Sequence, residues 1–513
     1  MSNNLIFYDT ETTGLIKDFA QILQCGSIQA NRNLEIQDEQ NLGCAPLPWA
    51  IPHPMAMVTN KKTHLFNSNV SHYEMMRDLN RQWRQWTIDE PGVFITFNGM
   101  AYDEELVRRQ FYWNLFESYL TNTNGNSRLD LLLMMNNIAA FSPALLNIPL
   151  YDGGPAISLK QADLAEANGI EIGDAHDAIA DCKLMISLLK IINEKKPELL
   201  DYFLNISSKA GVQEAIQKPG FLGLGEVFRR EVFRYPVVPC GSKAPNDLMF
   251  FDLSFEPEEI FDLDTQEIYS MVQKPGKSGP FKKYGINKTI PICPSSMIDD
   301  KNAFDIDFSV LDDRAKQVRD NVDFQSLVSQ AMADKINNWN NEYDHIEQMI
   351  YSGGFPSKED KDLMADFHRI DSAEERIKIC RNITDERHRL FAERLICQFY
   401  PQAAPEDMMS RYQALITQRL NEEGPWGSMS KVMTDLEALL DKDNFNEARG
   451  IDESEARLMV KKLAKHEGIF AGTSTGLNLV GALQLAKEIG KGRNVVTLAC
   501  DSGFKYLNGN LFS

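Results

Sequence analysis

Residues 5–12 read LIFYDTET, an apolar strand pattern whose end carries two carboxylates, Asp9 and Glu11. Successive side chains of a β-strand point to opposite faces, so these two acids point the same way. Two hard oxygen ligands on one rigid strand suit Mg²⁺ or Mn²⁺, and a bound cation offsets the repulsion between them. The stretch therefore predicts the first part of a metal site.

A second strand brings another acid to the same end. Residues 93–97, VFITF, read as a buried strand, and the turn Asn98-Gly99 leads into a helical pattern at AYDEEL, residues 101–106. Asp103 is therefore expected just beyond a strand end.

A third segment, GDAHDAIADC at residues 173–182, predicts the start of a helix with Asp174 as the candidate N-cap. His176 would lie in the first turn and Asp181 about one turn further in, whereas Asp177 is interpreted as a capping residue only. Taken alone, each motif is more often a solvated strand end or a cap. Four acids and one histidine in this order favour a site instead.

Such a set supplies what phosphodiester hydrolysis needs. Two metal ions held by four carboxylates can stabilise both the attacking water and the leaving oxygen of an in-line displacement. A histidine, whose ordinary pKa lies near neutrality, suits general-base work on that water. The segments thus favour a metal-dependent phosphodiesterase.

The ordered motifs resemble the DEDD superfamily of 3′→5′ exonucleases, in the branch whose last motif carries histidine (DEDDh). The other branch has a tyrosine four residues before the final aspartate, where this chain has Asp177. The resemblance implies a ribonuclease H-like α/β domain with a mixed sheet, and it implies that Glu11 approaches the 3′ end of the substrate. The resemblance also implies a catalytic set. Two Mg²⁺ ions (or Mn²⁺) would be held by Asp9, Glu11, Asp103 and Asp181, and His176 would be the general base.

A narrower resemblance, over about residues 1–450, is to the bacterial exodeoxyribonuclease I family. It rests on segments within 103–114, 126–132, 158–170, 195–202 and 351–355. That family degrades single-stranded DNA to mononucleotides, with bases stacked on aromatic rings and cations along the phosphates. The strand contacts that we expect are Arg108, Tyr119, Arg128 and Lys160.

For each of these four residues the alternative is an exposed helix charge or a half-buried tyrosine. The family usually has arginine where Lys160 stands. A bidentate hydrogen-bonded contact between arginine and a phosphate would therefore be replaced there by the single charge of a lysine ammonium group.

The composition is that of an ordinary globular protein, with 43% of the 513 residues hydrophobic and 25% charged. We find no run of roughly eighteen apolar residues and no signal-peptide pattern, so we expect a cytoplasmic protein without membrane contact. Separately, we expect a monomer. Eight cysteines without a Cys-x-x-Cys pair predict reduced thiols rather than a zinc site or a disulfide framework.

A formal charge of −20 means that nucleic-acid binding would need a local basic groove. The candidates are Arg229, Arg230 and Arg234, and the segment 274–288, in which lysines alternate with glycines and aromatic residues. A solvated loop is the alternative interpretation. If the groove exists, binding should weaken steeply with added salt.

We expect four parts along the chain. Residues 1–195 alternate strand and helix patterns, 196–350 carry short β-type runs between Gly and Pro, and 351–449 have helical spacing. The family resemblance makes these the exonuclease domain, an SH3-like β-barrel domain with added helices, and a helical C-terminal domain. Residues 450–513 form a short appended α/β fragment outside that plan.

The appended fragment resembles the C-terminal end of cysteine synthase-like, pyridoxal-phosphate-dependent enzymes. Its pattern is a helix, the turn GTSTG at residues 472–476, a second helix, a strand near 495–499 and a turn. In that family the serine matching Ser502 faces the pyridine nitrogen of the cofactor. A functional site also needs a Schiff-base lysine and a phosphate loop, which we do not find, so we expect a fused fragment without pyridoxal phosphate.

Two other functions stay open. One is a catalytically impaired scaffold that binds single-stranded nucleic acid, in which the tail has disturbed the nuclease. The other is an RNA-directed DEDD exonuclease, although the large accessory domains favour DNA. The family resemblance also suggests contact with the acidic tail of single-stranded-DNA-binding protein and a role in DNA repair and recombination.

Overall fold

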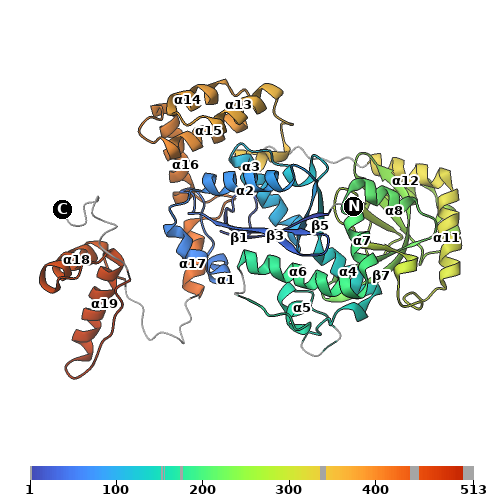
Figure 1. Ribbon diagram of the computed structural model, residues 1–513, viewed down its shortest axis with the longest axis horizontal. Helices are drawn as coiled ribbons and strands as arrows, with labels where there is room; N and C mark the ends of the chain where they lie inside the picture. The colour runs from blue at the N-terminus through green and yellow to red at the C-terminus, as the bar shows by residue number, and fades with distance from the viewer. Residues whose placement is uncertain are drawn as a thin grey trace. The chain divides into compact units, whose positions relative to one another are not determined.

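The computed structural model describes residues 3–151, 154, 156–173, 177–334, 343–439 and 450–500. By its internal contacts the chain divides into two compact units, residues 1–435 and 436–513. The first unit holds two β-sheets and a group of C-terminal helices, and the second holds a helix pair (Figure 1). The boundaries expected at 195, 350 and 449 remain predictions.

The first sheet is mixed, as the sequence predicts. Its strands lie in the order β3-β2-β1-β4-β5, with β1 antiparallel to β2 and parallel to β4. The strand bounds are β1 (Asn4–Thr12), β2 (Ile22–Asn31), β3 (Ile36–Gly43), β4 (Gly92–Thr96) and β5 (Ser127–Asp130). The strand that carries Asp9 and Glu11 is therefore the central one, which fixes its end on both sides.

Helices cover both faces of this sheet. Ile6 and Tyr8 lie in one apolar cluster with residues of α2 (His72–Trp86) and α3 (Asp103–Trp113). Leu5 and Phe7 lie in another with residues of α4 (Leu131–Phe141) and α6 (Ala178–Lys195). Figure 1 shows these two helix pairs on opposite sides of the sheet. Both faces of β1 are thus buried, and its polar end is left for chemistry.

The remaining helices of this part of the chain are short. They are α1 (Pro54–Asn60), α5 (Gln161–Ala167), α7 (Pro197–Asn205) and α8 (Lys209–Gln217).

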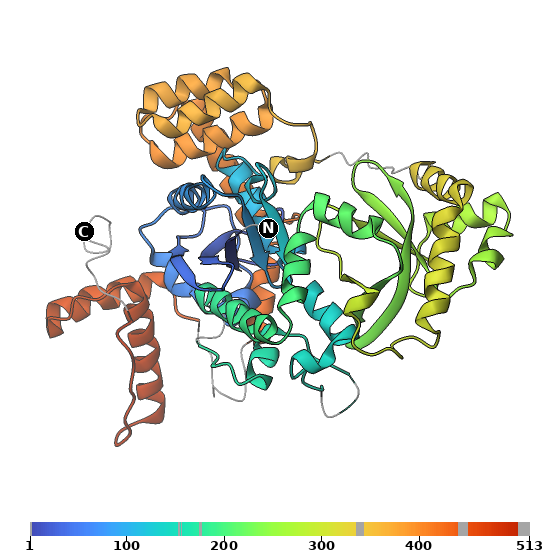
Figure 2. The same ribbon diagram turned by 45° about the vertical axis from the view of Figure 1, so that its right-hand side comes forward.

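The second sheet is antiparallel, with five strands in the order β10-β6-β7-β8-β9. Their bounds are β6 (Leu222–Phe228), β7 (Glu231–Lys243), β8 (Asp247–Asp252), β9 (Phe281–Gly285) and β10 (Ile292–Pro294). Figure 2 shows the long helices α11 (Phe308–Asp320) and α12 (Val322–Asp334) alongside it, and shorter helices α9 (Pro257–Phe261) and α10 (Thr265–Gln273) precede them. The β-type runs expected here are present, and the SH3-like barrel stays a prediction.

Helices follow in the rest of the first unit, as the helical spacing indicates. The short 3-10 helix η6 (Ile346–Tyr351) precedes them. The helices are α13 (Lys358–Arg369), α14 (Ala373–Asn382), α15 (Glu386–Phe399), α16 (Glu406–Asn421) and α17 (Met429–Leu439).

The second unit contains α18 (Glu453–Glu467) and α19 (Thr473–Ile489). A Cβ on Gly476 would lie 2.4 Å from the carbonyl oxygen of Ala456, so glycine permits the close crossing of the two helices. The strand expected near 495–499 is wrong, because these residues are irregular. A strand needs a neighbour to satisfy its backbone groups, and Val496 and Leu498 are 88% and 74% exposed. Ser502 lies outside the described residues.

The cysteines are free thiols, as expected. Seven are buried and Cys500 is exposed. Within the described part of the chain, no helix is long and apolar enough to cross a membrane.

Candidate metal centre

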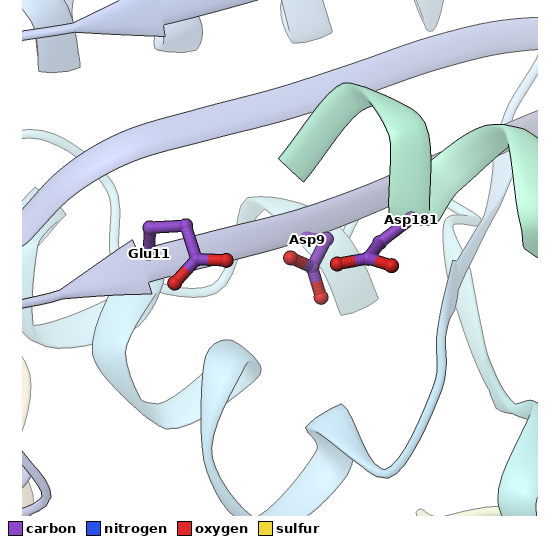
Figure 3. A group of neighbouring side chains, drawn as sticks. All are labelled: Asp9, Glu11 and Asp181. Carbon is purple, nitrogen blue, oxygen red and sulfur yellow. The ribbon is translucent and has the colours of Figure 1, made fainter. Parts of the chain in front are cut away.

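Three of the predicted acids meet at the end of β1. One carboxylate oxygen from each of Asp9, Glu11 and Asp181 lies within 4.8 Å of the others. Figure 3 shows Asp9 and Glu11 on the strand and Asp181 descending from the helix beside them, with the carboxylates of Asp9 and Asp181 close together. Three hard oxygen donors that converge in this way fit a divalent cation such as Mg²⁺ or Mn²⁺.

A glycine in the neighbouring strand lets the helix reach the site. Gly26 of β2 pairs with Asp9, and a Cβ there would lie 2.5 Å from the backbone of both Ala178 and Ile179. Any other residue would push the first turn of α6 away from the sheet. The sequence carries a signal for this approach, since an isolated glycine within a strand pattern often marks a close backbone contact.

The helix that carries Asp181 begins later than its sequence predicts. Its N-cap is Asp177, whose side chain accepts a hydrogen bond from the backbone of Ile179, so the assignment of the cap to Asp174 is wrong. Gln24 and Lys62 also hold the Asp177 carboxylate, at 2.9 and 3.2 Å. Burial alone would raise the pKa of Asp177, but these two partners bring it below its ordinary value. Its interpretation as a cap is confirmed.

The sequence predicts His176 in the first turn of this helix. Both His176 and Asp174 lie outside the described residues.

Asp103 opens α3, just beyond β4, as predicted. Its carboxylate accepts a hydrogen bond from the hydroxyl of Thr10, and it is 8% exposed. A Cβ on Gly99 would lie 2.8 Å from the Asp103 carboxylate, so the Asn98-Gly99 turn leaves room for this acid. The side chain lies near enough for its charge to act on Asp9 and Glu11.

The pKa values describe a site of crowded negative charge. Burial raises the pKa of Asp9 well above its ordinary range, and Asp103, Asp181 and Glu11 raise it further. Burial and the charge of Asp181 raise the pKa of Glu11 to about 8, although Lys62 opposes them. Burial raises the pKa of Asp103 to about 6, against the hydrogen bond from Thr10. A bound cation would remove this cost by pairing with the ionised carboxylates.

Two of the residues predicted to contact the DNA strand are arginines held in internal ion pairs. The guanidinium groups of Arg108 and Arg128 lie 2.8 and 2.9 Å from the same oxygen of Glu104. That glutamate is 1% exposed, and the two arginines outweigh burial to lower its pKa. Glu104 and Arg108 are one helical turn apart in α3, a spacing visible in the sequence, whereas Arg128 comes from β5 and its approach to Glu104 is not. A role of Arg108 or Arg128 in strand binding remains a prediction.

The other two predicted contacts are more open. Tyr119 is half-buried, with the guanidinium of Arg108 5.0 Å from its ring centre, and Lys160 is exposed at the N-cap of α5. The ring of Tyr119 also meets Phe355 edge-on at 5.6 Å. Phe355 is 75% exposed and was not predicted, although the two glycines before it, both with positive φ, mark a turn that presents it.

Three of the predicted basic residues, Arg229, Arg230 and Lys277, are exposed at one hairpin. Arg229 and Arg230 make the turn between β6 and β7, and Lys277 places its ammonium group 3.2 Å from the ring centre of Phe228. Arg230 lies 3.2 Å from the ring centre of Tyr151. These residues combine exposed cations with aromatic faces, which we call the hairpin patch. Elsewhere in the predicted segment, Lys282 is buried and faces Asp252 at 3.4 Å.

Solved structures show the same fold. Exonuclease I from Methylocaldum szegediense matches with a TM-score of 0.71 and 22% identity, over 87% of this chain and 96% of that one. Escherichia coli exonuclease I in complex with a dA16 oligonucleotide matches with a TM-score of 0.70 and 19% identity, over 95% and 100%. A structure of SSB/exonuclease I with an inhibitor matches with a TM-score of 0.67 and 19% identity, over 96% and 100%.

Sequence comparison divides the chain in two. Exodeoxyribonuclease I of Buchnera aphidicola is 24% identical over 433 residues, which cover 80% of this chain and 96% of that protein. Residues 423–501 match the pyridoxal-phosphate dependent enzyme family. Cysteine synthase of Dictyostelium discoideum is 46% identical over 70 residues, which are 12% of this chain and 18% of that protein. The chain is thus similar to exodeoxyribonuclease I over most of its length and to the cysteine synthases over a C-terminal fragment.

Proposed function

We propose that this chain is an exodeoxyribonuclease I, a metal-dependent enzyme that degrades single-stranded DNA from the 3′ end to mononucleotides. The observation that carries the proposal is the convergence of Asp9, Glu11 and Asp181 within 4.8 Å at the end of a central strand. The similarity to exodeoxyribonuclease I over 96% of that relative's length supports the same reading.

The three converging acids fit a divalent cation, and we propose two Mg²⁺ ions there with Asp103 as the fourth ligand. Bound there, the ions would supply Lewis-acid stabilisation of the charge that develops on the phosphate. Asp9 and Glu11 are fixed by the sheet, and Asp181 by the contact of α6 with Gly26. The chain's own part is therefore to hold four carboxylates ready, so that little reorganisation is needed during the reaction.

His176 is proposed as the general base that takes a proton from the attacking water, on the grounds of the DEDDh motif. Glu11, two residues further along β1 than Asp9, is proposed to approach the 3′ end of the strand. Substitution of His176 tests the first of these roles.

Strand binding is proposed to use exposed aromatic faces with cations beside them. Phe355 and Tyr119 offer one such surface, and the hairpin patch offers another. Stacking tolerates any base, since every base has a π face, and the cations favour the phosphates. A contact with single-stranded-DNA-binding protein, a monomeric state, a cytoplasmic location and a role in DNA repair are further proposals from the family resemblance.

The catalytically impaired scaffold is the less favoured function, because the acidic cluster is intact in this chain. An RNA-directed exonuclease is also less favoured, because exonuclease I in complex with a dA16 oligonucleotide, a DNA strand, shares the fold over 95% of this chain.

The test compares DNA and RNA oligomers of one sequence, each labelled at the 5′ end, with Mg²⁺ or EDTA. We expect a ladder that shortens from the 3′ end of the DNA, needs Mg²⁺, and releases mononucleotides. His176→Ala should lose activity at least a hundredfold, and the exposed His466→Ala serves as its control. Preferred cleavage of RNA, or strand binding without hydrolysis, would contradict the proposal.

A further inference from the structure

A loop of residues 13–20 follows directly after the strand that carries the acids. It starts two residues after Glu11, and backbone bonds hold its base, from Thr13 to the carbonyl of Gln21 at 2.9 Å and from Ala20 to the carbonyl of Ile16 at 2.7 Å. Its tip is open, with Leu15 83% exposed. The loop is thus joined directly to the strand end that carries Asp9 and Glu11.

The C-terminal helical region packs against the base of the loop. The guanidinium of Arg419, at the end of α16, lies 4.6 Å from the ring centre of Phe19 and 4.0 Å from that of Trp426. The ring of His345 meets both aromatic rings edge-on, at 5.8 and 5.2 Å. Phe19 of the loop is therefore in contact with residues more than three hundred positions away in the sequence.

Arg419 is an unusual residue to use only for packing. Its side chain is 1% exposed, and it is paired at 2.8 Å with Glu347, which is equally buried. Among the residues that the structure describes, its Nε and Nη1 atoms have no hydrogen-bond partner. A buried charge is costly unless it is well compensated, and here the compensation comes from one carboxylate and two aromatic faces. Moving any of these groups would leave the buried charge less compensated. The energetics therefore favour a single arrangement of Arg419, Glu347 and the two aromatic rings.

The same region forms a cleft with the loop. A hollow with an empty volume of about 490 Å³ is lined on one side by loop residues, among them Gly14 and Ile16, and on the other by Trp426 and Val432. Asp435 closes it through a 3.2 Å contact with His53, whose backbone N–H donates to the carbonyl of Thr13. These contacts all lie within the first compact unit.

We infer that Phe19, Arg419 and Trp426 are positioning residues, which hold the loop after the metal centre in the arrangement that hydrolysis requires. Trp426 lies inside the segment 423–501 that matches the pyridoxal-phosphate dependent enzymes. The first residues of that segment thus pack within the same compact unit as the exonuclease-like residues. The C-terminal fragment is therefore not a separate appendage from residue 423 onward. The inference rests on the proposed exonuclease activity, and its first test does not.

That first test is hydrogen exchange in the full chain. In Trp426→Ala, the amides of Phe19 and Ala20 should exchange at least tenfold faster, while those of Leu5–Tyr8 in β1 keep their rates. Trp426→Phe should restore most of the protection, because it keeps an aromatic face against Arg419. Arg419→Lys keeps the positive charge but loses the flat guanidinium group. It should speed the exchange of the same two amides while the side chain of Trp426 stays in place.

The second test is kinetic, with Mg²⁺ and a single-stranded DNA oligomer. Trp426→Ala should lower kcat at least tenfold while the affinity for Mg²⁺ changes less than twofold, since the acids lie on β1 and α6. The control is Phe324→Ala, a buried aromatic residue of the second sheet's core at 4% exposure. It should lower the unfolding temperature comparably without a similar loss of kcat.

Unchanged exchange at Phe19 and Ala20, or equal losses of kcat in Trp426→Ala and Phe324→Ala, would overturn the inference. If the unaltered protein has no nuclease activity, the proposed function fails. The exchange experiment still decides whether the contact holds the loop.

Discussion

Replacing Glu11 by glutamine should stabilise the metal-free protein above neutral pH. The pKa of Glu11 is raised from 4.5 to about 8, first by burial and then by Asp181. Between these two values the folded protein holds a proton that the unfolded chain has released, so the free energy of unfolding falls as the pH rises. Below pH 4.5 Glu11 is protonated in both the folded and the unfolded chain and does not affect the free energy of unfolding. Above about pH 8 it is ionised in both, and the full electrostatic cost lowers the free energy of unfolding.

The size of the effect follows from the shift. Between three and four pH units at about 1.36 kcal/mol each give an upper limit of roughly 5 kcal/mol. Partial access of water to Glu11 screens the repulsion, so we expect a gain of about 2 kcal/mol for Glu11→Gln at pH 8.5. Glutamine keeps the shape of the side chain and removes the charge.

The assay is thermal unfolding in EDTA from pH 4 to 9. The difference between Glu11→Gln and the unaltered protein should be near zero at pH 4 and grow steadily up to about pH 8. The exposed Glu259→Gln is the control, and it should follow the unaltered protein throughout. Mg²⁺ should stabilise the unaltered protein more strongly at high pH and do little for Glu11→Gln. Parallel curves for Glu11→Gln and the unaltered protein would refute the electrostatic account.

Three further predictions concern other parts of the account. Gly26→Ala should destabilise the protein by about 1–3 kcal/mol and weaken Mg²⁺ binding at least tenfold in calorimetry, because the added Cβ meets the backbone of α6. The control is Gly481→Ala, whose Cβ would meet nothing within 4 Å and which should change neither quantity. Glu104→Gln should lower the free energy of unfolding by about 3–5 kcal/mol in urea, since it leaves two buried arginines without their shared carboxylate. Phe355→Ala should weaken binding of a single-stranded DNA oligomer several-fold in fluorescence anisotropy at an unchanged unfolding temperature, since the ring is 75% exposed; unchanged affinity would exclude it from the strand path.

The sequence predicts which acids lie at the end of β1 because their placement depends largely on local rules. Strand alternation alone places Asp9 and Glu11 on one side, and the Asn98-Gly99 turn places Asp103 beyond the next strand. The approach of Asp181 depends on Gly26, a contact between residues more than 150 positions apart. There the order of motifs, rather than any local pattern, carries the prediction.

The error at the N-cap of α6 has its cause in contacts that are distant in sequence. Asp174 and Asp177 are equally good capping residues, and Gln24 and Lys62 decide between them. The ion pairs of Arg108 and Arg128 with Glu104 do not decide whether these arginines contact DNA, so that role remains a prediction.

The strand near 495–499 fails for the complementary reason. Its apolar residues suit a sheet, but among the described residues it pairs with no other strand. A β-pattern therefore predicts a strand only when the chain also supplies a partner.

The most direct test of the central claim is the rate at which Asp181→Asn releases nucleotides from a 5′-labelled single-stranded DNA oligomer at saturating Mg²⁺. The substitution keeps the shape of the side chain and removes one of three converging carboxylates. We predict a loss of at least a thousandfold relative to the unaltered protein, with the unfolding temperature in EDTA equal or higher. A rate within tenfold of the unaltered protein would contradict a metal centre built on Asp9, Glu11 and Asp181.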